Sequence, residues 1–492
     1  MIHRYRPRGA ARDALECRDP ELLLSGPAGT GKAQPLDATV WTPTGPRRMG
    51  DIAVGDHILT PDGGSGVVAD IPFDGSAPVY RVTFSDGSRV ECSDGHLWAV
   101  HWRDGNGRER VGVRSLADIM ANPRYRGGTR ARYWIPQTEP VEFAPRPVPI
   151  PAYTLGVLLG DGYLRTGEVS FTTADAEMAD RVAEEVGPRY RLKRTAKAGN
   201  TASLYRIAPD GWRPRRPSRA KAGYVSRTGS GKWMARVRVP DRSAVARYIG
   251  SFGSAEGALE AIAAEAGTAF SEAELAGDGI YADVERLGLG NARSATKFVP
   301  EMYKLNSAAV RWDLLRGLMD TDGYAERSTV SFTTVSPALA EDVRWLVESL
   351  GGIANIRTKQ PSGGQLAYTV WIRLGCPADA FALSRKRSRT GPRVATVKRW
   401  IEDVEPIGER RCRCIAVDTR DGLYLTDRFV VTHNSRAALE KLHLAALKYP
   451  GMRGLIVRKT LSSLGSTALV TWREHVAKEA LAKAEAEGMT FA

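Results

Sequence analysis

The sequence predicts a multidomain chain in which pieces of an α/β fold flank a long insertion that carries a duplicated α+β unit. Three observations predict this organisation. The 492 residues correspond to about three domains at ~150 residues each. A phosphate-binding loop breaks off after Lys32 and resumes at Ser435. Two stretches that begin at Asp161 and Asp322 repeat with the same internal spacing.

The composition is typical of a globular protein with a polyanionic partner. Hydrophobic residues make up 42% and charged residues 26% of the chain, which excludes a wholly disordered protein. No stretch approaches the ~18 consecutive apolar residues of a membrane-spanning helix, so we expect no membrane partner. Five cysteines, an odd number in a long chain, favour a reduced, cytoplasmic location. The net charge of +14 favours a nucleic acid as the partner.

The broken phosphate loop is the first element along the chain. Residues 22–32 place an apolar strand before the pattern G-x-x-x-x-G-K, with Gly26, Gly31 and Lys32 as candidates to bind ATP phosphates. The pattern requires Ser or Thr next, to bind Mg²⁺, and a helix after it, but the next residue is Ala33. Ser435 begins a helix-like stretch that leads into an apolar strand at 454–459. Joining Lys32 to Ser435 therefore completes the loop, and residues 33–434 form the insertion.

The end of this insertion carries residues suited to cutting its own peptide bond. Asn434 can cyclise by attack of its side chain on its own carbonyl, and His433 can polarise that carbonyl or protonate the leaving amine. Ser435 offers a hydroxyl as an acyl acceptor beside the cut.

The insertion resembles an intein of the class that lacks the first nucleophile. The block that starts at Gln34 is similar to the first intein block, and Ala33 stands where most inteins have Cys or Ser. A Trp–Cys–Thr triplet marks this class, and it is matched here by Trp98, Cys414 and Thr432. The resemblance implies an all-β Hint-type splicing domain over 33–150 and 385–434, which needs no cofactor.

By this resemblance, the Cys414 thiolate attacks the Lys32 carbonyl, Ser435 takes the acyl group, Asn434 cyclises, and an acyl shift leaves a Lys32–Ser435 peptide. His96 would polarise the upstream bond, and Ser93 lies where family members usually have Thr.

Three alternatives stay open for this centre. Cys412 could be the nucleophile instead of Cys414, since a strand places both on one face. Trp98 could be only a core residue. Ala33 could be a decayed or replaced first nucleophile in an ordinary intein.

The repeat at 161-residue spacing lies inside the insertion. Asp161-Gly-Tyr and Asp322-Gly-Tyr are each followed, nine residues after the aspartate, by Ser-Phe-Thr-Thr. Helix-like segments follow at 175–186 and 338–350, so two copies of one unit are expected to pack with pseudo-twofold symmetry. The apolar runs before each aspartate resemble the LAGLIDADG motif of homing endonucleases, with halves at 151–210 and 271–384.

That resemblance implies two motif helices packed through Gly156 and Gly317, with Asp161 and Asp322 meeting at their ends to hold Mg²⁺ for hydrolysis of opposite DNA strands. Lys297 matches a lysine block of the family and could stabilise charge near the scissile phosphate. A surface lysine is the other interpretation of Lys297.

A basic stretch separates the two halves. Residues 211–250 carry 11 Lys and Arg but one acid, with aromatic residues between them, which favours a folded DNA-binding unit over a linker. The stretch resembles the Apetala-type DNA-binding domain, which implies three strands and a helix at 255–266 within an insert at 211–270. Its candidate DNA contacts are Arg227, Lys232, Arg236, Arg238 and Arg247.

The flanks, 1–32 and 435–492, look like the start of a phage terminase large subunit, an ATP- and Mg²⁺-dependent motor. The sequence thus predicts a phage-encoded, monomeric intein that cleaves the intein-less host gene site in double-stranded DNA and leaves a host able to meet its terminase partners. The alternative is a P-loop ATPase with a passive DNA-binding insertion and no splicing.

Overall fold

The computed structural model describes residues 33–433 apart from 166–167, 188–189, 197–200, 210–222, 229–230, 238–246, 255–256, 259–260, 262–278, 328, 361–363, 392–396 and 420–421. The predicted positions Gly26, Gly31, Lys32, Asn434 and Ser435, and Arg238 of the basic stretch, therefore lie outside the described residues. So do both host flanks and most of the helix expected at 255–266.

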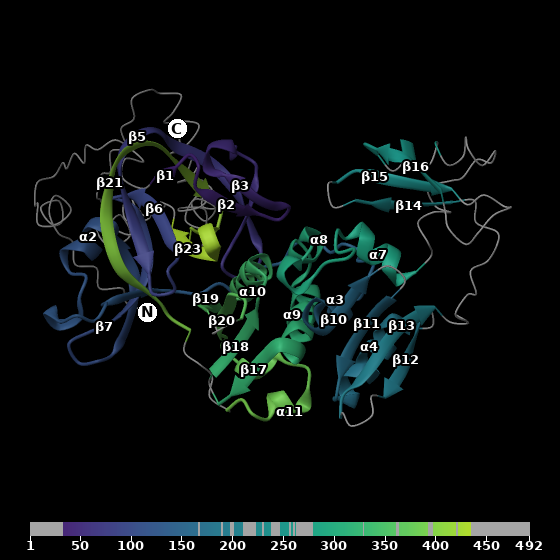
Figure 1. The fold of residues 1–492 in the computed structure, drawn as a ribbon. Helices are drawn as coiled ribbons and strands as arrows, with labels where there is room; N and C mark the ends of the chain where they lie inside the picture. Colours follow the sequence, from purple (N-terminus) through teal and green to yellow (C-terminus); the bar gives the residue numbers. More distant parts are fainter. Residues whose placement is uncertain are drawn as a thin grey trace, which may run out of the picture.

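The first unit, which we call the β unit, consists of two sheets built from both ends of the insertion (Figure 1). The larger sheet contains β1 (Gln34–Pro35), β4 (His57–Leu59), β5 (Ser65–Phe84), β6 (Arg89–Ser93), β7 (Leu97–Arg103), β8 (Glu109–Ser115), β9 (Tyr133–Ile135) and β21 (Arg399–Val417). The smaller sheet has the order β23 (Val430–His433), β22 (Leu423–Thr426), β2 (Thr39–Thr42), β3 (Gly45–Arg48). One short helix, α2 (Leu116–Ala121), accompanies them.

The two long strands β5 and β21 form the central pair of the β unit. They pair antiparallel from Ile401 opposite Phe84 to Val417 opposite Val68, with several bulges. Bulges bend a strand and increase its twist, and Figure 1 shows β21 curving over the unit. Because β5 comes from the start of the insertion and β21 from its end, this pairing joins the two ends into one domain.

The second unit, the α+β unit, contains the predicted duplication. Its first half runs α3 (Ala152–Asp161), β10 (Gly162–Arg165), β11 (Glu168–Thr173), α4 (Ala176–Val186), β12 (Tyr190–Ala196), β13 (Ser203–Pro209). Its second half runs α9 (Ala308–Asp322), β17 (Gly323–Glu326), β18 (Thr329–Thr334), α10 (Pro337–Ser349), β19 (Ile353–Lys359), β20 (Ala367–Arg373). The sheets have matching orders, β10-β11-β13-β12 and β17-β18-β20-β19, so the same unit occurs twice.

Short helices complete the α+β unit: α7 (Ile280–Arg286), α8 (Glu301–Lys304) and α11 (Ser384–Arg387). Helix α11 belongs here by its contacts, because Lys386 binds the end of α9 and Thr390 bridges to Arg327. The chain therefore leaves this unit after Thr390, a few residues beyond the expected boundary at 385.

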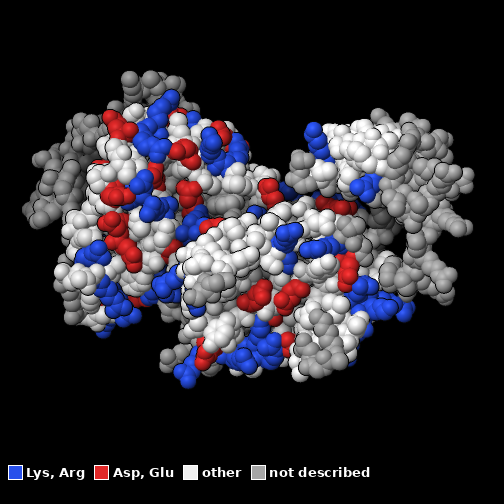
Figure 2. Space-filling model, in the orientation of Figure 1, with Lys and Arg blue, Asp and Glu red and all other residues white. Residues whose placement is uncertain are grey.

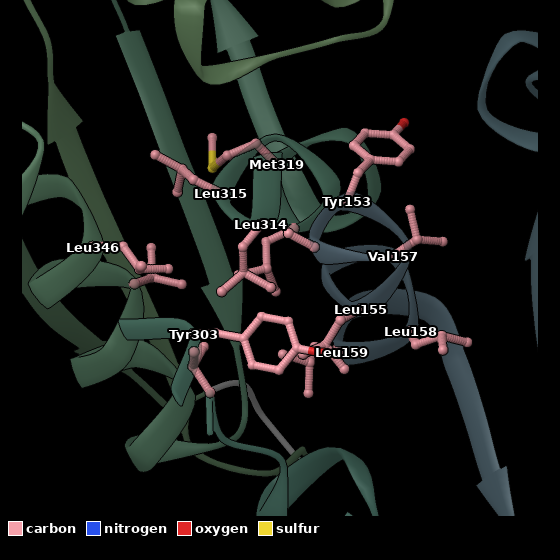
Figure 3. Packing of buried hydrophobic residues seen from close by; sticks show 14 of the residues in the cluster. Tyr153, Leu155, Val157, Leu158, Leu159, Tyr303, Leu314, Leu315, Met319 and Leu346 are labelled. Atoms are coloured by element: carbon pink, nitrogen blue, oxygen red, sulfur yellow. The ribbon is translucent and has the colours of Figure 1, made fainter. Parts of the chain in front are cut away.

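The motif helices α3 and α9 form the centre of the largest hydrophobic core. Figure 3 shows them side by side, with Leu155 and Leu159 of α3 near Leu314 of α9. Gly156 and Gly317 lie at the closest approach. A Cβ atom added at Gly156 would be 2.3 Å from the Leu314 carbonyl oxygen, and one added at Gly317 would be 2.2 Å from that of Tyr153. The expected packing through these two glycines is present.

Within the basic stretch, the strands β14 (Gly223–Arg227), β15 (Trp233–Val237) and β16 (Arg247–Phe252) form a three-stranded antiparallel sheet, which lies apart from both other units in Figure 1. Ala235 is buried against Ala258, with Trp233 and Phe252 packed beside them. This small core shows that the described residues of the stretch, 223–228, 231–237 and 247–250, are folded and are not an extended linker.

Candidate functional site

The first residue of the insertion is held inside the β unit. Ala33 is fully buried, and its backbone N–H donates to the Ser93 hydroxyl at 3.0 Å, while the Ser93 N–H donates to the Ala33 carbonyl at 3.0 Å. The donating N–H belongs to the peptide bond between Lys32 and Ala33. Ser93 at the end of β6 therefore binds the N–H of the upstream junction and the carbonyl of the next peptide bond.

The predicted His96, Trp98 and Thr432 lie together next to Ser93. The His96 N–H donates to the Ser93 carbonyl at 3.1 Å, and the His96 Nε2 atom is hydrogen-bonded to the Thr432 hydroxyl. The Trp98 ring meets the His96 ring edge-on, with centroids 5.3 Å apart. Since β23 packs against β7, the last described strand of the insertion is brought beside the block that holds its first residue.

Trp98 also belongs to the hydrophobic core. It is 0% exposed and packs against Phe84 and Val430 in one cluster. Trp98 can therefore be both a core residue and part of the candidate site, because a rigid buried indole fixes the plane of the His96 ring beside it.

Cys414 lies across from Ala33. Gln34 pairs with Arg413 in the contact between β1 and β21, so the same register continued by one residue sets Ala33 opposite Cys414. Ala33, Cys412 and Cys414 are members of one buried cluster. All four cysteines in the described ranges are free thiols.

The competing thiol, Cys412, pairs with Pro35, two residues further from the junction than Ala33. Burial raises the pKa of Cys412 to about 11, so little of it is thiolate at neutral pH, and the thiolate is the nucleophilic form. The register of β1 with β21, which sets Ala33 opposite Cys414, favours Cys414 over Cys412 as the attacking residue.

Gln34 is a site residue that the sequence reasoning missed. Its side-chain carbonyl accepts from the Tyr424 hydroxyl at 2.7 Å, and its amide donates to Thr426 at 3.3 Å. These bonds tie the start of the insertion to β22. No sequence signal identifies this role, because a glutamine after the junction has no distinctive spacing to either partner.

A second centre is formed by the ends of the motif helices. Asp161 and Asp322 are the last residues of α3 and α9, and both are exposed. Desolvation and then the negative charge of Asp161 raise the pKa of Asp322 to about 6. Desolvation also raises the pKa of Asp161. Both carboxylates also feel the charges of Lys297 and Lys386, which lower their pKa values.

Two buried lysines bind the helix ends in the same way. Lys297 donates to the carbonyls of Leu158, Gly160 and Gly162 at 2.9–3.0 Å. Lys386 donates to those of Met319, Thr321 and Gly323 at 2.7–3.1 Å. Each acceptor of one set lies 161 residues from its counterpart in the other. Cations stabilise helix C-termini, where carbonyls lack intrahelical partners.

Lys297 is 3% exposed and Lys386 is 6% exposed, so Lys297 is not a surface lysine. Desolvation lowers the pKa of each lysine to about 8. The sequence reasoning missed Lys386, although a signal existed. Lys297 follows Asp161 by 136 residues and Lys386 follows Asp322 by 64, and removing the insert at 211–270 makes these distances similar.

The carboxylate pair suits a hard divalent cation. Carboxylate oxygens are the ligands that Mg²⁺ and Ca²⁺ prefer, and a cation between Asp161 and Asp322 would relieve the repulsion that contributes to the raised pKa of Asp322. In the described ranges, no group of three or more His, Cys, Asp and Glu residues could hold a metal. The chain would thus supply two ligands and leave the others to water and substrate.

Basic side chains lie on the exposed faces of the two sheets that follow the carboxylates. Tyr163 and Tyr324, one residue beyond each Asp-Gly, are exposed. On the outer strands β10, β12 and β19 the exposed basic residues are Arg165, Arg191, Lys193, Arg194, Arg357 and Lys359. Figure 2 shows Lys and Arg gathered at the lower edge of the α+β unit, around α11.

In the basic insert, Lys232 is exposed and Arg236 is half-buried on β15. Arg236 alternates with the buried Ala235 and so lies on the opposite face of the sheet. Arg227 and Arg247 are placed as strand ends of β14 and β16.

Comparison with known proteins supports part of this assignment. A family model described as a LAGLIDADG-like domain matches residues 310–384. The replicative DNA helicase DnaB of Mycobacterium intracellulare is 26% identical over 457 residues, which cover 87% of this chain and 63% of the helicase. The chain thus spans less than two thirds of the length of that relative.

Two solved structures are also similar to parts of the chain. The MchDnaB-1 intein is 32% identical and covers 19% of this chain and 62% of its own, with a TM-score of 0.15. I-DmoI in complex with DNA and Mn is 13% identical and covers 45% of this chain and 87% of its own, with a TM-score of 0.24.

The chain therefore contains a LAGLIDADG-like domain, and the predicted architecture is confirmed for residues 310–384. The comparisons do not show a terminase host. The two flanks together make up fewer than a fifth of the chain, so a match over 87% of it falls mostly within 33–434 and says little about the host. Among the described residues, no helix is long and apolar enough to cross a membrane.

Proposed function

We propose that residues 33–434 form a self-splicing intein with an embedded homing endonuclease, and that splicing joins Lys32 to Ser435. The observation that carries this proposal is the arrangement around Ala33. Ser93 binds the backbone of Ala33, His96 connects Ser93 to Thr432, and Cys414 lies opposite Ala33 in the sheet register. Residues from four distant parts of the chain converge where the insertion begins and where its described part ends.

In the mechanism, the Cys414 sulfur forms a bond to the Lys32 carbonyl carbon. The bond from that carbon to the Ala33 nitrogen breaks, and the nitrogen takes a proton from the centre. Ser93 holds the departing Ala33 N–H, and His96, whose backbone is hydrogen-bonded to Ser93, is the candidate donor of that proton. The oxygen of Ser435 then displaces the sulfur, which restores the Cys414 thiol.

The downstream bond breaks when the Asn434 amide nitrogen attacks its own carbonyl carbon, which forms a succinimide and frees the Ser435 amine. That amine attacks the neighbouring ester and yields the Lys32–Ser435 amide. No external oxidant, reductant or metal is consumed. The hydrogen bond from Thr432 to His96 connects the upstream and downstream junctions and orders the strand that leads to His433.

Expression of the whole chain tests the splicing proposal. The proposed reaction gives a ligated host product of 90 residues and a free insertion of 402 residues, which intact mass measurement distinguishes from the 492-residue chain. Cys414→Ala should abolish cleavage after Lys32 and ligation, because no other thiol lies opposite Ala33.

Cys412→Ala is the matched control and should leave ligation present. Ligation by the Cys414→Ala variant would refute direct attack by this residue. A wild-type chain that stays at 492 residues would support the alternative, an ATPase with a passive insertion.

The endonuclease proposal rests on the paired ends of α3 and α9. Asp161 and Asp322 would hold divalent cations, which supply charge stabilisation for phosphodiester hydrolysis. Lys297 and Lys386 keep each helix end in place, and the exposed basic sheet faces would bind the phosphate backbone. The Apetala-like sheet would extend the DNA contact, with Lys232 and Arg236 as contact candidates together with Arg227, Arg238 and Arg247.

A plasmid carrying the joined Lys32/Ser435 coding site tests the endonuclease. The protein should cut it with Mg²⁺ and not with a chelator. Asp322→Asn should reduce double-strand cleavage by at least ~100-fold, because the DNA strand hydrolysed beside Asp322 loses the cation ligand that stabilises charge in the transition state. Asp313→Asn, a partly exposed residue on the same helix, is the control and should cleave normally. Equal cleavage by both variants would exclude the helix-end pair as the nuclease centre.

We also propose that the flanks assemble a P-loop that binds ATP and Mg²⁺ through Gly26, Gly31, Lys32 and Ser435 after splicing. The terminase identity of the host remains a prediction.

A further inference from the structure

The turn that leads into β23 has an unusual backbone. Arg428 has φ 51° and Phe429 has φ 54°, so two consecutive residues with side chains adopt the left-handed region. Such conformations are uncommon outside glycine and persist only where the surroundings hold them. Thr432 and His433 follow within the next five residues, so the direction in which the chain leaves this turn sets the positions of both side chains.

The α+β unit holds the first of these residues. The Arg428 guanidinium donates to the Glu348 carboxylate from Nε at 3.1 Å and also from a terminal nitrogen. It donates as well to the Ala354 carbonyl at 3.2 Å. Glu348 lies near the end of α10 and is 3% exposed. Removing one partner of a buried ion pair is strongly destabilising, so the pair of Arg428 and Glu348 holds the turn against α10.

The same guanidinium reaches the β unit. It donates to the Asp86 carbonyl at 3.4 Å, and the Asp86 carboxylate accepts from Arg399 at 2.8 Å. Arg428 thus connects the end of α10 with the loop between β5 and β6 and with the start of β21. The other three groups of this network are buried.

The α+β unit also holds the second residue. The Phe429 ring stacks on Trp41 with centroids 4.2 Å apart. Trp345 of α10 meets both rings edge-on, at 5.3 Å from Phe429 and 5.9 Å from Trp41. Val431 belongs to the same cluster, while Val430 faces the core around Trp98. β23 therefore lies between the aromatic cluster on one side and the His96 centre on the other.

We propose that α10 of the endonuclease is a positioning element for protein splicing, and that Glu348 and Trp345 set the geometry of the downstream junction through Arg428 and Phe429. This inference rests on the proposed splicing function. Upstream attack depends on Ala33, Ser93 and Cys414, which the hydrogen bond between Ala33 and Ser93 and the pairing of β1 with β21 hold together inside the β unit. Loosening α10 from the turn therefore affects Asn434 cyclisation more than upstream cleavage.

The test uses Glu348→Gln in the full chain, with the two junctions measured separately by mass spectrometry. Upstream cleavage is read as release of residues 1–32 by added dithiothreitol, and downstream cleavage as release of residues 435–492. The expected result is a fall of at least tenfold in downstream cleavage, with the upstream rate within twofold of wild type. Arg344→Gln is the control, because Arg344 lies on the same helix and pairs with Glu341.

A second variant covers the case in which Glu348→Gln does not fold. Arg428→Lys keeps the positive charge beside Glu348 and removes the forked contacts to Ala354 and Asp86, so the same selective loss is expected. DNA cleavage at the wild-type rate in either variant shows that the α+β unit is intact. The inference is overturned if wild type splices and neither variant loses downstream cleavage selectively. A wild-type chain that does not splice overturns the proposed function instead.

Discussion

At the scale of single residues, the hydroxyl of Ser93 performs the most specific contact of the splicing centre. It accepts the N–H of the peptide bond that must break, and its own backbone N–H fixes the other side of Ala33. Ser93 thus holds Ala33 by its N–H and by its carbonyl, which keeps Ala33 opposite Cys414, the attacking thiol that we propose. Proximity of this kind contributes to rate by pre-organisation.

Ser93→Ala should slow upstream cleavage without unfolding the β unit. The substitution leaves the buried N–H of Ala33 without its acceptor, which costs about 1–3 kcal/mol, or roughly a tenfold to hundredfold loss of rate if it is felt in the transition state. Time courses of upstream cleavage in the full chain measure this.

Ser93→Thr supplies the rescue, since it restores a hydroxyl at the same atom. If Ser93→Ala cleaves as fast as wild type, or if Ser93→Thr is equally slow, the hydrogen bond to Ala33 has no role in the reaction.

At the scale of elements, the helices α3 and α9 determine how far apart the two carboxylates lie. Gly156 and Gly317 let the two helix backbones approach closely. A Cβ atom added to either glycine would lie only 2.9 Å from the Cα atom of the other. Each helix ends in an aspartate, and each end is fixed by a lysine, Lys297 or Lys386. Any change that separates the helices therefore moves both carboxylates.

Gly156→Ala should destabilise the α+β unit and reduce DNA cleavage together. The added methyl group would meet backbone atoms of α9, which cannot rotate away as a side chain could, and overpacking of this kind costs about 1–3 kcal/mol. Thermal unfolding in a background with both Cys414→Ala and Asn434→Ala, which blocks both junctions and keeps the chain at one length, should show the melting temperature lowered by a few degrees.

Gly375→Ala is the matched control, because a Cβ atom there has no neighbour within 4 Å. Equal melting temperatures for the two alanine variants would contradict the proposed role of close helix packing.

At the scale of the whole molecule, the two units are connected more closely than an insertion of one domain into another requires. The segment between them contacts both, since the Glu142 N–H donates to the Gly63 carbonyl at 2.9 Å and the Val141 N–H donates to the Ser349 carbonyl at 3.0 Å. Arg311 of α9 is fully buried and donates to the Val141 carbonyl. The aromatic cluster around Trp41 draws residues from both units as well.

Much of this organisation was predictable from the sequence because it depends on local patterns. The 161-residue repeat predicted two equal halves, and both halves have the same order of helices and strands. The residue types His96, Trp98, Cys414 and Thr432 identified a candidate centre by their motifs. Lys386 was missed because the basic insert shifts its spacing, and Gln34 was missed because its partners lie about 390 residues away.

The amino-acid sequence was enough to predict most of the candidate residues for the chemistry, since motif spacing and residue type follow from the linear order of the chain. Only the tertiary structure decided how the two units act on each other. The pairing of β5 with β21, the contact of Arg428 with Glu348, and the position of Trp345 on Phe429 all join residues far apart in the chain. Such contacts depend on how folded surfaces meet in space, and no local periodicity or motif records that.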